Sequence, residues 1–492
     1  MVHSSTATRR ARAGLLLGVL LVVIAIAGAS LRGDAPGPGV PLVPTPPGGR
    51  GDGEPFADPF AYDADREPEL VRRAAAGTSH VLYARSPGGA MATARRVARW
   101  RPLVESAARQ ARVPADLVEG LVFLESAGRA DAMAGSTEGA VGLTQILAET
   151  GRNLLQMHVD VARSARLTQR IARQELRGRG DLVARLVARR RTVDERFDPA
   201  KALAGTARYL AFARAQLGRT DLALAAYHMG VGNLQSVIRL SGEDAPSYAR
   251  LYFDATPTRN PAVQKRLASF GDDSSTYLFK IYAAADIMRL FRRDPSKLAR
   301  LDGLHANKNS AEEVLHPPGD TPSFPTPAAL KEAWDRGDIV LFPQRPAVTG
   351  LARDPTMGAL AERLGVPRGL YRGLRPEALA MALYIGAQVR AYAGGDAPLV
   401  VTSTVRDETY QRLLVASNRE ATRNFSLHTT GWAFDIARSY TSGRQALAFQ
   451  FVLDRLQTLD AIAWVREPGA IHVTASHDAA ALEPALHRLG LG

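Results

Sequence analysis

A single glutamate lies among apolar residues that could shift the pKa of its carboxyl group into the range useful for proton transfer. Apolar residues recur at helical spacing after Pro114, which suits the first turn of a helix, and Glu125 projects into the apolar face that they form. The residues of that face are Leu117, Val118, Leu121, Val122 and Leu124. Removal from water raises the pKa of a carboxyl group, so this side chain could hold a proton near neutral pH. The position indicates either a catalytic acid or a helix-end carboxylate held by backbone or an arginine.

Two histidines and an aspartate form a second group that could do chemistry. His428 precedes Asp435 by seven residues, and His472 lies in a strand-like segment whose neighbouring apolar residues face the opposite side. Such a trio can make a three-ligand zinc site with the fourth position open to water. Arg406 ends another strand-like run, which begins at Val401. The sequence therefore predicts a metal site in its C-terminal part.

The elements that must position these groups change along the chain. From about Arg95 to Arg300 the apolar spacing is helical, and few strand-like runs occur before Pro398. The proline-rich residues 301–350 form either an ordered connector or a poorly structured linker, and a helix and a strand follow after Arg375. We predict a multidomain chain, with an all-α domain at 95–300, a connector at 301–350 and an α+β domain at 351–492.

The N-terminal segment predicts export. Three arginines precede nineteen uncharged residues, Ala13 to Leu31, which as a helix reach ~28 Å, nearly the thickness of a bilayer core. Positive charge keeps the short N-terminal end in the cytoplasm, so the rest lies in the periplasm or cell-wall space. A cleaved signal peptide is the alternative, because Ala27-Gly28-Ala29 resembles a cleavage site. We expect a transmembrane helix within 1–33, then a Pro/Gly linker and lead-in at 34–94.

Composition narrows the class of protein. The 492 residues are 46% apolar and 23% charged, which excludes collagen, a disordered tail and a multispan channel. The absence of cysteine excludes disulfides, cysteine-bound zinc, thiol catalysis and a lipoprotein anchor. A net charge of +13 predicts attraction to anionic polymers. We expect no nucleic-acid partner, because the predicted topology places the chain outside the cytosol and no nucleic-acid-binding motif is recognised.

Three ordered motifs carry a family resemblance. Glu125-Ser126, the glycine-punctuated segment Ser136 to Ile146 and the segment Ala225 to Asn233 together resemble the motifs of the soluble lytic transglycosylases, lysozyme-like enzymes of bacterial peptidoglycan. The resemblance extends from about Pro114 to Phe291. It implies a lysozyme-like fold, Glu125 as the sole catalytic acid/base, and a sugar groove lined by Ser126, Gly142, Leu143, Gln145, Tyr227 and Tyr277.

One departure and the expected chemistry follow from this resemblance. His228 and Met229 stand where the family usually has Asn and Ala. A hydrolase normally uses two carboxyl groups, whereas the implied reaction uses the substrate's own C6 hydroxyl as nucleophile and leaves a 1,6-anhydro sugar. Glu125 would protonate the glycosidic oxygen and then accept the hydroxyl proton. Asp131 and Glu138 are the nearest further carboxylates, and both are expected to be solvated.

A basic segment interrupts the family pattern. Residues 152–195 contain eleven arginines and five acidic residues, which indicates a helical insertion. The insertion is either a solvated hairpin braced by arginine-carboxylate pairs or a basic surface for anionic glycan or lipid headgroups.

The C-terminal group also resembles a known family. The spacing His-x-x-Gly-x-Ala-x-Asp from His428 to Asp435, followed by His472, resembles the zinc D-Ala-D-Ala carboxypeptidases and dipeptidases, whose fold the hedgehog signalling domain shares. The resemblance implies that these three residues bind Zn²⁺ and that Arg406 binds a substrate carboxylate or oxyanion. The family's general-base glutamate would be at Gly469, so Glu467 is the nearest candidate.

Together these patterns predict a membrane-anchored, peptidoglycan-remodelling enzyme. Its glycan-cleaving domain would be joined to a domain that either cleaves or binds stem peptides. The expected partners are peptidoglycan, the inner membrane and a cell-envelope protein complex. The alternative is a non-catalytic wall-binding or assembly protein that uses both domains for recognition.

Overall fold

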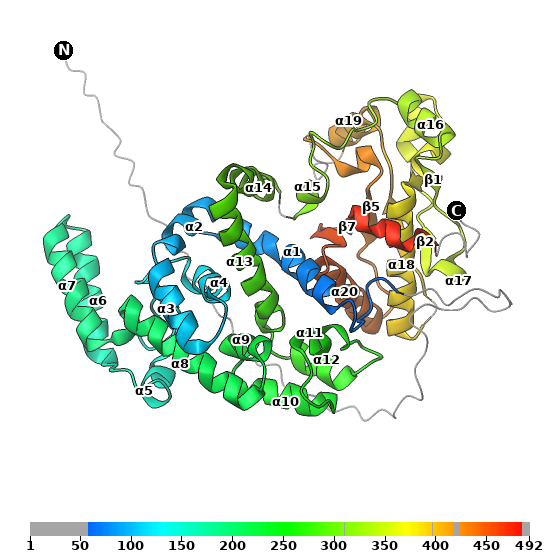
Figure 1. Cartoon of the computed structure of the whole chain (residues 1–492). Coiled ribbons are helices and arrows are strands. Elements are labelled where there is room, and N and C mark those ends of the chain that lie inside the picture. The colour runs from blue at the N-terminus through cyan, green and yellow to red at the C-terminus, as the bar shows by residue number, and fades with distance from the viewer. Residues whose placement is uncertain (1–57, 309, 396, 418–423, 485–492) are drawn as a thin grey trace, which may run out of the picture. The chain divides into compact units, whose positions relative to one another are not determined.

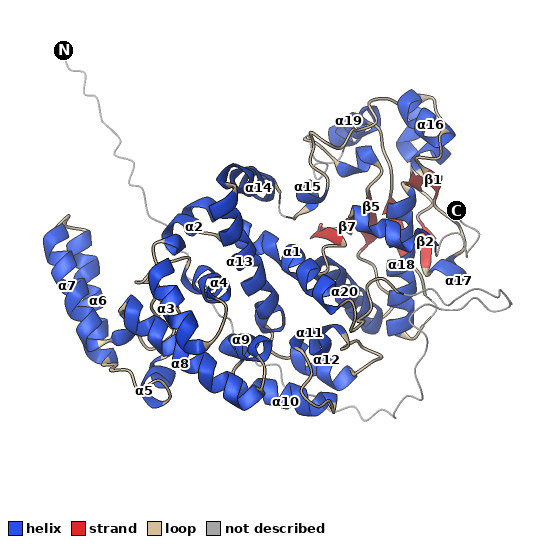
Figure 2. Ribbon diagram, in the orientation of Figure 1, coloured by secondary structure: helices blue, strands red, loops and turns tan. Residues whose placement is uncertain are grey.

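A computed structural model describes residues 58–484 except 309, 396 and 418–423 (Figure 1). The described chain is mostly helical, with a small sheet in its C-terminal part (Figure 2). Within these residues, no helix combines the length and the apolar character that crossing a membrane requires. The predicted transmembrane helix lies outside the described residues, so it stays a prediction.

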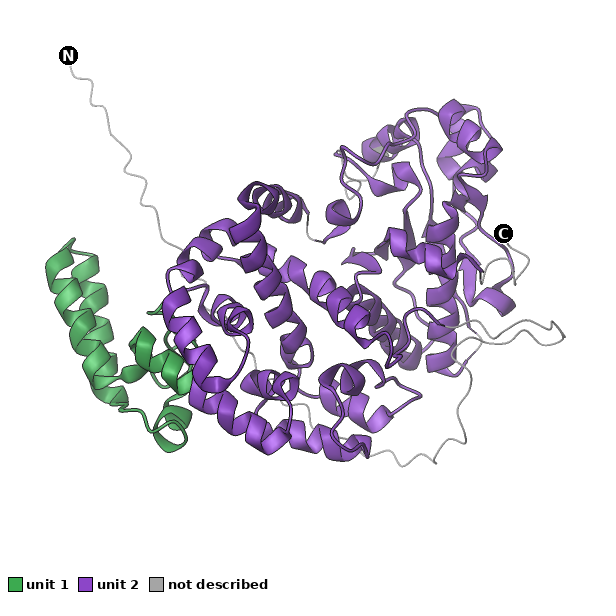
Figure 3. Cartoon of the chain, in the orientation of Figure 1, with its two compact units in different colours: residues 1–35, 129–206 green, residues 36–128, 207–492 purple. Residues whose placement is uncertain are grey.

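Two compact units divide the chain (Figure 3). Among the described residues, the smaller unit comprises 129–206, and the larger comprises 58–128 and those from 207 to 484. Most of the region assigned to the glycan-cleaving domain therefore shares a unit with the C-terminal sheet. The division differs from the predicted boundary at 350, because packing between distant helices, and not chain order, determines which residues form one unit.

Helices begin earlier than the sequence pattern indicated. The segment assigned to linker and lead-in contains α1 (Glu67–Arg85) and most of α2 (Ala90–Ala98). Helix α1 packs against α13 (Tyr277–Arg293) and α20 (Gly443–Thr458). Its buried face mixes apolar residues with Arg73 and Thr78, so its apolar periodicity is weak, and the start near Arg95 was wrong.

In the helical part of the larger unit, α4 (Ala115–Ser126) packs against α13 and also contacts α2 and α3 (Arg101–Ala111). Helix α4 is buried on more than one side, since Glu119 and Gly120 are as enclosed as the predicted apolar face. The other helices of this part are α9 (Thr220–Met229), α10 (Val231–Ser241), α11 (Tyr248–Phe253), α12 (Pro261–Ala268) and α14 (Pro295–Asn307), and α8 (Pro199–Leu217) begins in the smaller unit and ends in the larger one.

Gly120 permits the close approach of α4 and α13. A Cβ atom at this position would lie 2.5 Å from the carbonyl oxygen of Ile281 and 3.0 Å from the amide nitrogen of Ala285. We expect Gly120→Ala to lower the free energy of unfolding by about 1–3 kcal/mol, because the new methyl group must separate two backbones. Thermal or urea unfolding measures the change. Gly232→Ala in α10 is the matched control, since its Cβ would meet no atom within 4 Å, and an equal loss there would contradict the packing argument.

The smaller unit contains α5 (Ala148–Asn153) and a helical hairpin, α6 (Val161–Glu175) and α7 (Gly180–Val193). The hairpin has a small core of its own, formed by Leu167, Ile171, Leu186 and Val193. Among the described residues, no carboxylate forms an ion pair with an arginine between 161 and 193. The hairpin is therefore held by apolar packing, and the expected bracing by arginine-carboxylate pairs is wrong.

The C-terminal part of the larger unit is built on five strands in the order β2-β4-β5-β7-β6. These are β2 (Leu351–Arg353), β4 (Leu399–Ser403), β5 (Ala433–Ala437), β6 (Ile462–Arg466) and β7 (Ala470–Ala475). Strands β2 and β4 are parallel, and the other pairs are antiparallel. Helices α18 (Pro376–Ala393) and α20 pack against each other, and α18 also contacts β7. A small helix, α19 (Glu408–Ser417), follows β4.

The connector is ordered wherever the structure describes it. It contains the end of α14, then α15 (Glu312–Leu315), α16 (Pro327–Asp335), β1 (Val340–Leu341) and α17 (Pro346–Thr349). Strand β1 pairs with β3 (Gly373–Leu374). Of the two alternatives for residues 301–350, the ordered connector is therefore the one observed.

Candidate functional site

Glu125 lies in the last turn of α4, just before the left-handed residue Ala127 that ends the helix. The residue is half-buried, and its carboxylate accepts a hydrogen bond from the hydroxyl of Tyr277, the first residue of α13. Burial raises the pKa of Glu125 to about 7, against the opposing effects of the Tyr277 hydroxyl and His228. The carboxyl group is thus poised to give up or take a proton near neutral pH.

A charged cluster beside Tyr277 was not foreseen from the sequence. The ring of His228 stacks on that of Tyr277, with centroids 4.9 Å apart. His228 Nε2 lies 3.5 Å from Asp273 Oδ1 and 3.6 Å from Asp272 Oδ2, and Lys280 also pairs with Asp273. The hydrogen bond from His228, with Lys280, holds the pKa of Asp273 well below its usual range. Asp273 is therefore ionised and paired with His228 and Lys280, and it is not a second proton donor.

Other predicted groove residues of the larger unit differ in their placement. Tyr227 packs edge-on against Tyr209, with ring centroids 5.2 Å apart, and is close enough to Tyr277 to affect its pKa. Ser126 is buried, and its hydroxyl donates to the carbonyl of Val122 one turn earlier. The structure thus brings Glu125, Tyr227 and Tyr277 together, whereas the Ser126 side chain faces its own helix.

The predicted Gly-Leu-Thr-Gln turn belongs to the smaller unit. Gly142 has φ of +83°, and a Cβ there would lie 1.9 Å from the carbonyl oxygen of Arg196, so only glycine fits. The side-chain amide of Gln145 donates to the carbonyls of Gly142 (2.8 Å) and Ala132 (3.3 Å). Leu143 is fully buried, so its side chain serves the core of this unit. Asp131 and Glu138 are both exposed, as expected.

A buried arginine organises this turn. Arg196 pairs with Asp194 at 2.9 Å and donates to the carbonyls of Thr137 (2.7 Å) and Gly139 (3.0 Å). Both members of the ion pair are fully buried. The insertion predicted at 152–195 includes Asp194 but ends before Arg196, and nothing in the local spacing of these two residues distinguishes them from the exposed charges nearby. Arg196, about fifty positions later in the chain, therefore holds the glycine-punctuated segment in place through its hydrogen bonds.

Residues 180–249 match the family model described as Transglycosylase SLT domain. The match includes α9 with Tyr227 and His228, but it does not extend to Glu125 or the Gly142 turn. No curated protein matches the chain. The SLT match supports peptidoglycan lytic transglycosylase activity and peptidoglycan as the substrate.

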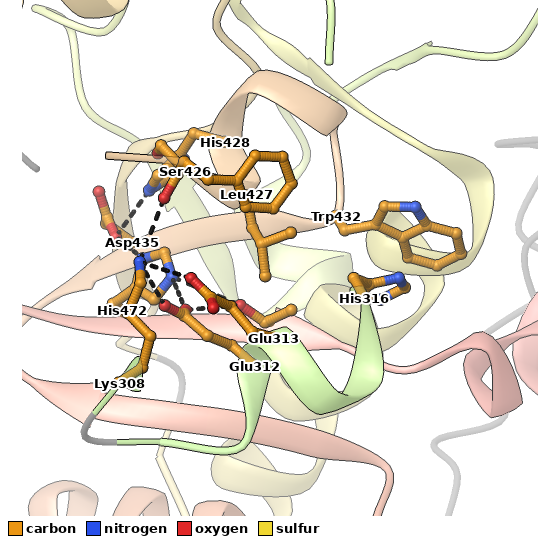
Figure 4. A network of polar contacts seen from close by, with 12 residues as sticks. Lys308, Glu312, Glu313, His316, Ser426, Leu427, His428, Trp432, Asp435 and His472 are labelled. Atoms are coloured by element: carbon orange, nitrogen blue, oxygen red, sulfur yellow. Dashed lines mark hydrogen bonds and ion pairs between the residues drawn. The ribbon is translucent and has the colours of Figure 1, made fainter. Parts of the chain in front are cut away.

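Outside the SLT match, the three predicted zinc ligands converge in the C-terminal sheet (Figure 4). Asp435 on β5 is directly opposite His472 on β7, and His428 comes from the short 3₁₀ helix Leu427–Thr430. One atom of each side chain lies within 4.8 Å of the other two. Asp435 Oδ1 is 3.2 Å from His428 Nε2 and 3.0 Å from His472 Nδ1.

Local structure fixes the orientation of the His428 ring in this cluster. Its Nδ1 lies 2.8 Å from the carbonyl oxygen of Thr404, so Nδ1 carries the proton and Nε2 faces Asp435. Gly431 has φ of +82°, and a Cβ there would lie 2.7 Å from Ile339, which explains the glycine in the spacing pattern. Two imidazole nitrogens and a buried carboxylate, with one histidine already oriented by a carbonyl, fit a zinc ion.

The charges of the cluster are also suited to a cation. Burial raises and the two imidazoles lower the pKa of Asp435, which ends well below its usual range, so this carboxylate is ionised. Burial opposes protonation of His472, but its hydrogen bonds to Asp435 and Glu312 outweigh this effect and raise the pKa of His472 to about 10. A bound metal would take the place of that proton.

The remaining predicted residues of this domain lie around the cluster. Arg406 donates to Ser403 Oγ at 2.6 Å and to Gln411 Oε1 at 3.0 Å, and it lies 3.4 Å from Asp435 Oδ2. Its guanidinium therefore already engages a predicted ligand. Glu467 lies in the β6–β7 turn, where its amide donates to Ala470, and its charge acts on Arg406.

One carboxylate at this cluster was not predicted from the sequence. Glu312 on α15 places Oε2 3.0 Å from His472 Nε2 (Figure 4). It comes from the connector, 160 residues before its partner in the chain. No helical or strand periodicity in the sequence connects Glu312 with the predicted ligands.

Proposed function

We propose that the chain cleaves peptidoglycan glycan strands without hydrolysis and that Glu125 is the single acid/base. The observation that carries this proposal is the half-buried Glu125 carboxyl, whose pKa is near 7 and whose partner is the Tyr277 hydroxyl. The SLT match in the neighbouring part of the chain supports the substrate class.

The proposed reaction needs Glu125 to give one proton to the leaving group and to take another from the nucleophile. Protonated Glu125 gives its proton to the glycosidic oxygen, and the bond from this oxygen to the anomeric carbon of the muramyl sugar breaks. The C6 hydroxyl of the same sugar attacks that carbon, and the Glu125 carboxylate takes the hydroxyl proton. The product is a 1,6-anhydro-muramyl end, and no water is consumed. Tyr277 orients the carboxylate throughout.

Digestion of purified peptidoglycan tests this function. We expect muropeptides with anhydro ends, each lighter by one water than the hydrolysis product. Reducing ends in their place would indicate a hydrolase. An absence of cleavage, with binding retained, would favour the wall-binding alternative.

Cleavage should depend on pH in a defined direction. Glu125 must be protonated to act as the acid, and its raised pKa of about 7 keeps a large fraction protonated near neutrality. We expect the rate to fall as pH rises through about 7, and to fall tenfold per unit well above it. A rate profile from pH 5 to 9 measures this. A fall near pH 4.5, the ordinary value for glutamate, would contradict the effect of burial.

For the C-terminal domain we propose a zinc site made by His428, Asp435 and His472. When bound, zinc would supply a Lewis acid able to activate water or polarise a peptide carbonyl. Arg406 would hold a substrate carboxylate or oxyanion, and Glu467 would accept a proton from water. If the domain only binds stem peptides, Arg406 has the same role without cleavage.

We also propose that the chain is exported and remains attached to the cytoplasmic membrane through Ala13 to Leu31. This rests on the arginine-flanked apolar run and the Pro/Gly-rich segment after it. The N-terminal residue of protein isolated from its host decides between an anchor and a removed signal peptide.

A further inference from the structure

We propose that the described residues of the segment Lys308 to His316, namely 308 and 310–316, complete the C-terminal metal site, with Glu312 as the carboxylate that positions the ligand His472. This inference rests on the proposed zinc site. It gives a role to part of the connector, which no sequence motif assigned to either domain.

Glu312 contacts the side of the His472 ring that is turned away from Asp435. Glu312 Oε2 lies 3.0 Å from Nε2, whereas Asp435 Oδ1 lies 3.0 Å from Nδ1 (Figure 4). A neutral imidazole carries its proton on one nitrogen and offers a lone pair on the other. A carboxylate that accepts from Nε2 keeps the proton there and leaves Nδ1 for the metal. Glu312 therefore sets both the tautomer and the ring orientation of His472.

The contacts of Glu312 make it a positioning residue and not a fourth ligand. Two described groups have ligand atoms that all lie within 4.8 Å of one another, and the one in the C-terminal sheet consists of His428, Asp435 and His472 and does not include Glu312. The other partners of Glu312 are Lys308, at 3.2 Å, and the hydroxyl of Thr474, at 3.4 Å. Its charge is thus shared between a lysine and the imidazole.

Both ends of the segment are attached to elements that carry the ligands. Lys308 donates to the carbonyl of Phe425, in the loop just before His428, at 3.1 Å. His316 Nε2 lies 2.6 Å from the carbonyl oxygen of Ala475, at the end of β7, and its ring stacks on Trp432 with centroids 4.3 Å apart. Glu312 is fixed between these two attachments, so its position is determined by the site itself.

Zinc affinity of the full chain tests the proposal. We expect Glu312→Gln to weaken zinc binding about 10–100-fold, the usual cost of losing an outer carboxylate partner of a ligating histidine. The visible absorption of the cobalt-substituted protein should keep its band positions, because all three ligands remain. Glu313→Gln is the matched control, since Glu313 is the next residue, is also buried, and pairs with Lys308 and Asn307.

Each result of these measurements has one interpretation. Unchanged zinc affinity in Glu312→Gln, or an equal loss in Glu313→Gln, would overturn the positioning role while leaving the zinc site intact. Altered cobalt bands in Glu312→Gln would show that Glu312 is itself a ligand, which also overturns it. Failure of the unsubstituted chain to bind zinc would instead overturn the metal site on which the inference rests. Unfolding temperatures of the metal-free variants separate a folding defect from a loss of affinity.

Discussion

Glu125→Gln is expected to reduce glycan cleavage by ~10²–10⁴-fold, the usual contribution of a positioned acid/base. Glutamine keeps the shape of the side chain and still accepts the hydrogen bond from Tyr277, but it cannot donate a proton and take one back. Release of anhydro-muropeptides from purified peptidoglycan measures the loss. Because the substituted side chain carries no charge to bury, the variant should fold at least as stably as the unsubstituted chain at pH 8.

Glu138→Gln makes the same chemical change at an exposed carboxylate and is the matched control. We expect its cleavage rate to stay at the level of the unsubstituted chain. Undiminished product from Glu125→Gln would remove Glu125 from the mechanism. Retained binding of peptidoglycan by the inactive variant would separate a chemical defect from a binding defect.

The second large effect is expected at the three proposed zinc ligands. The full chain should bind one zinc ion, and replacing His428, Asp435 or His472 with alanine should weaken binding on the order of a hundredfold or more. Zinc sites with four protein ligands bind with about 10–16 kcal/mol, or roughly 3 kcal/mol per ligand, and 1.4 kcal/mol is tenfold in affinity. Elemental analysis after equilibration with limiting zinc measures the occupancy.

His158→Ala is the matched control, because His158 is exposed and lies in the smaller unit. Its zinc content should equal that of the unsubstituted chain. A folded, unsubstituted protein without stoichiometric metal after zinc is added would contradict the site. If zinc binds, Glu467→Gln should abolish any peptide cleavage without releasing the metal, since only the proton acceptor is lost.

In the helical part of the chain, the local periodicity of apolar residues predicted some features and missed others. The spacing of apolar residues predicted α4 and the intrusion of Glu125 into its apolar face, because both depend on residues within four positions of each other. The same periodicity failed for α1, whose buried face includes Arg73 and Thr78 among its apolar residues. The periodicity also did not predict the cluster of His228, Asp272 and Asp273. His228 lies in α9 and the two aspartates lie just before α13, so these residues come together only when the two helices pack.

For the proposed C-terminal metal site, the sequence by itself determined which residue types are available as ligands. The eight-residue pattern from His428 to Asp435 and the alternation around His472 are local, and strand alternation fixes which side chains share a face. Only the tertiary structure decided that Asp435 and His472 are opposite each other, because register depends on how β5 and β7 pair. Only tertiary packing brought Glu312 to His472 and Arg196 beneath the Gly142 turn. Contacts between residues so far apart in the chain follow from packing of whole elements, which no local spacing encodes.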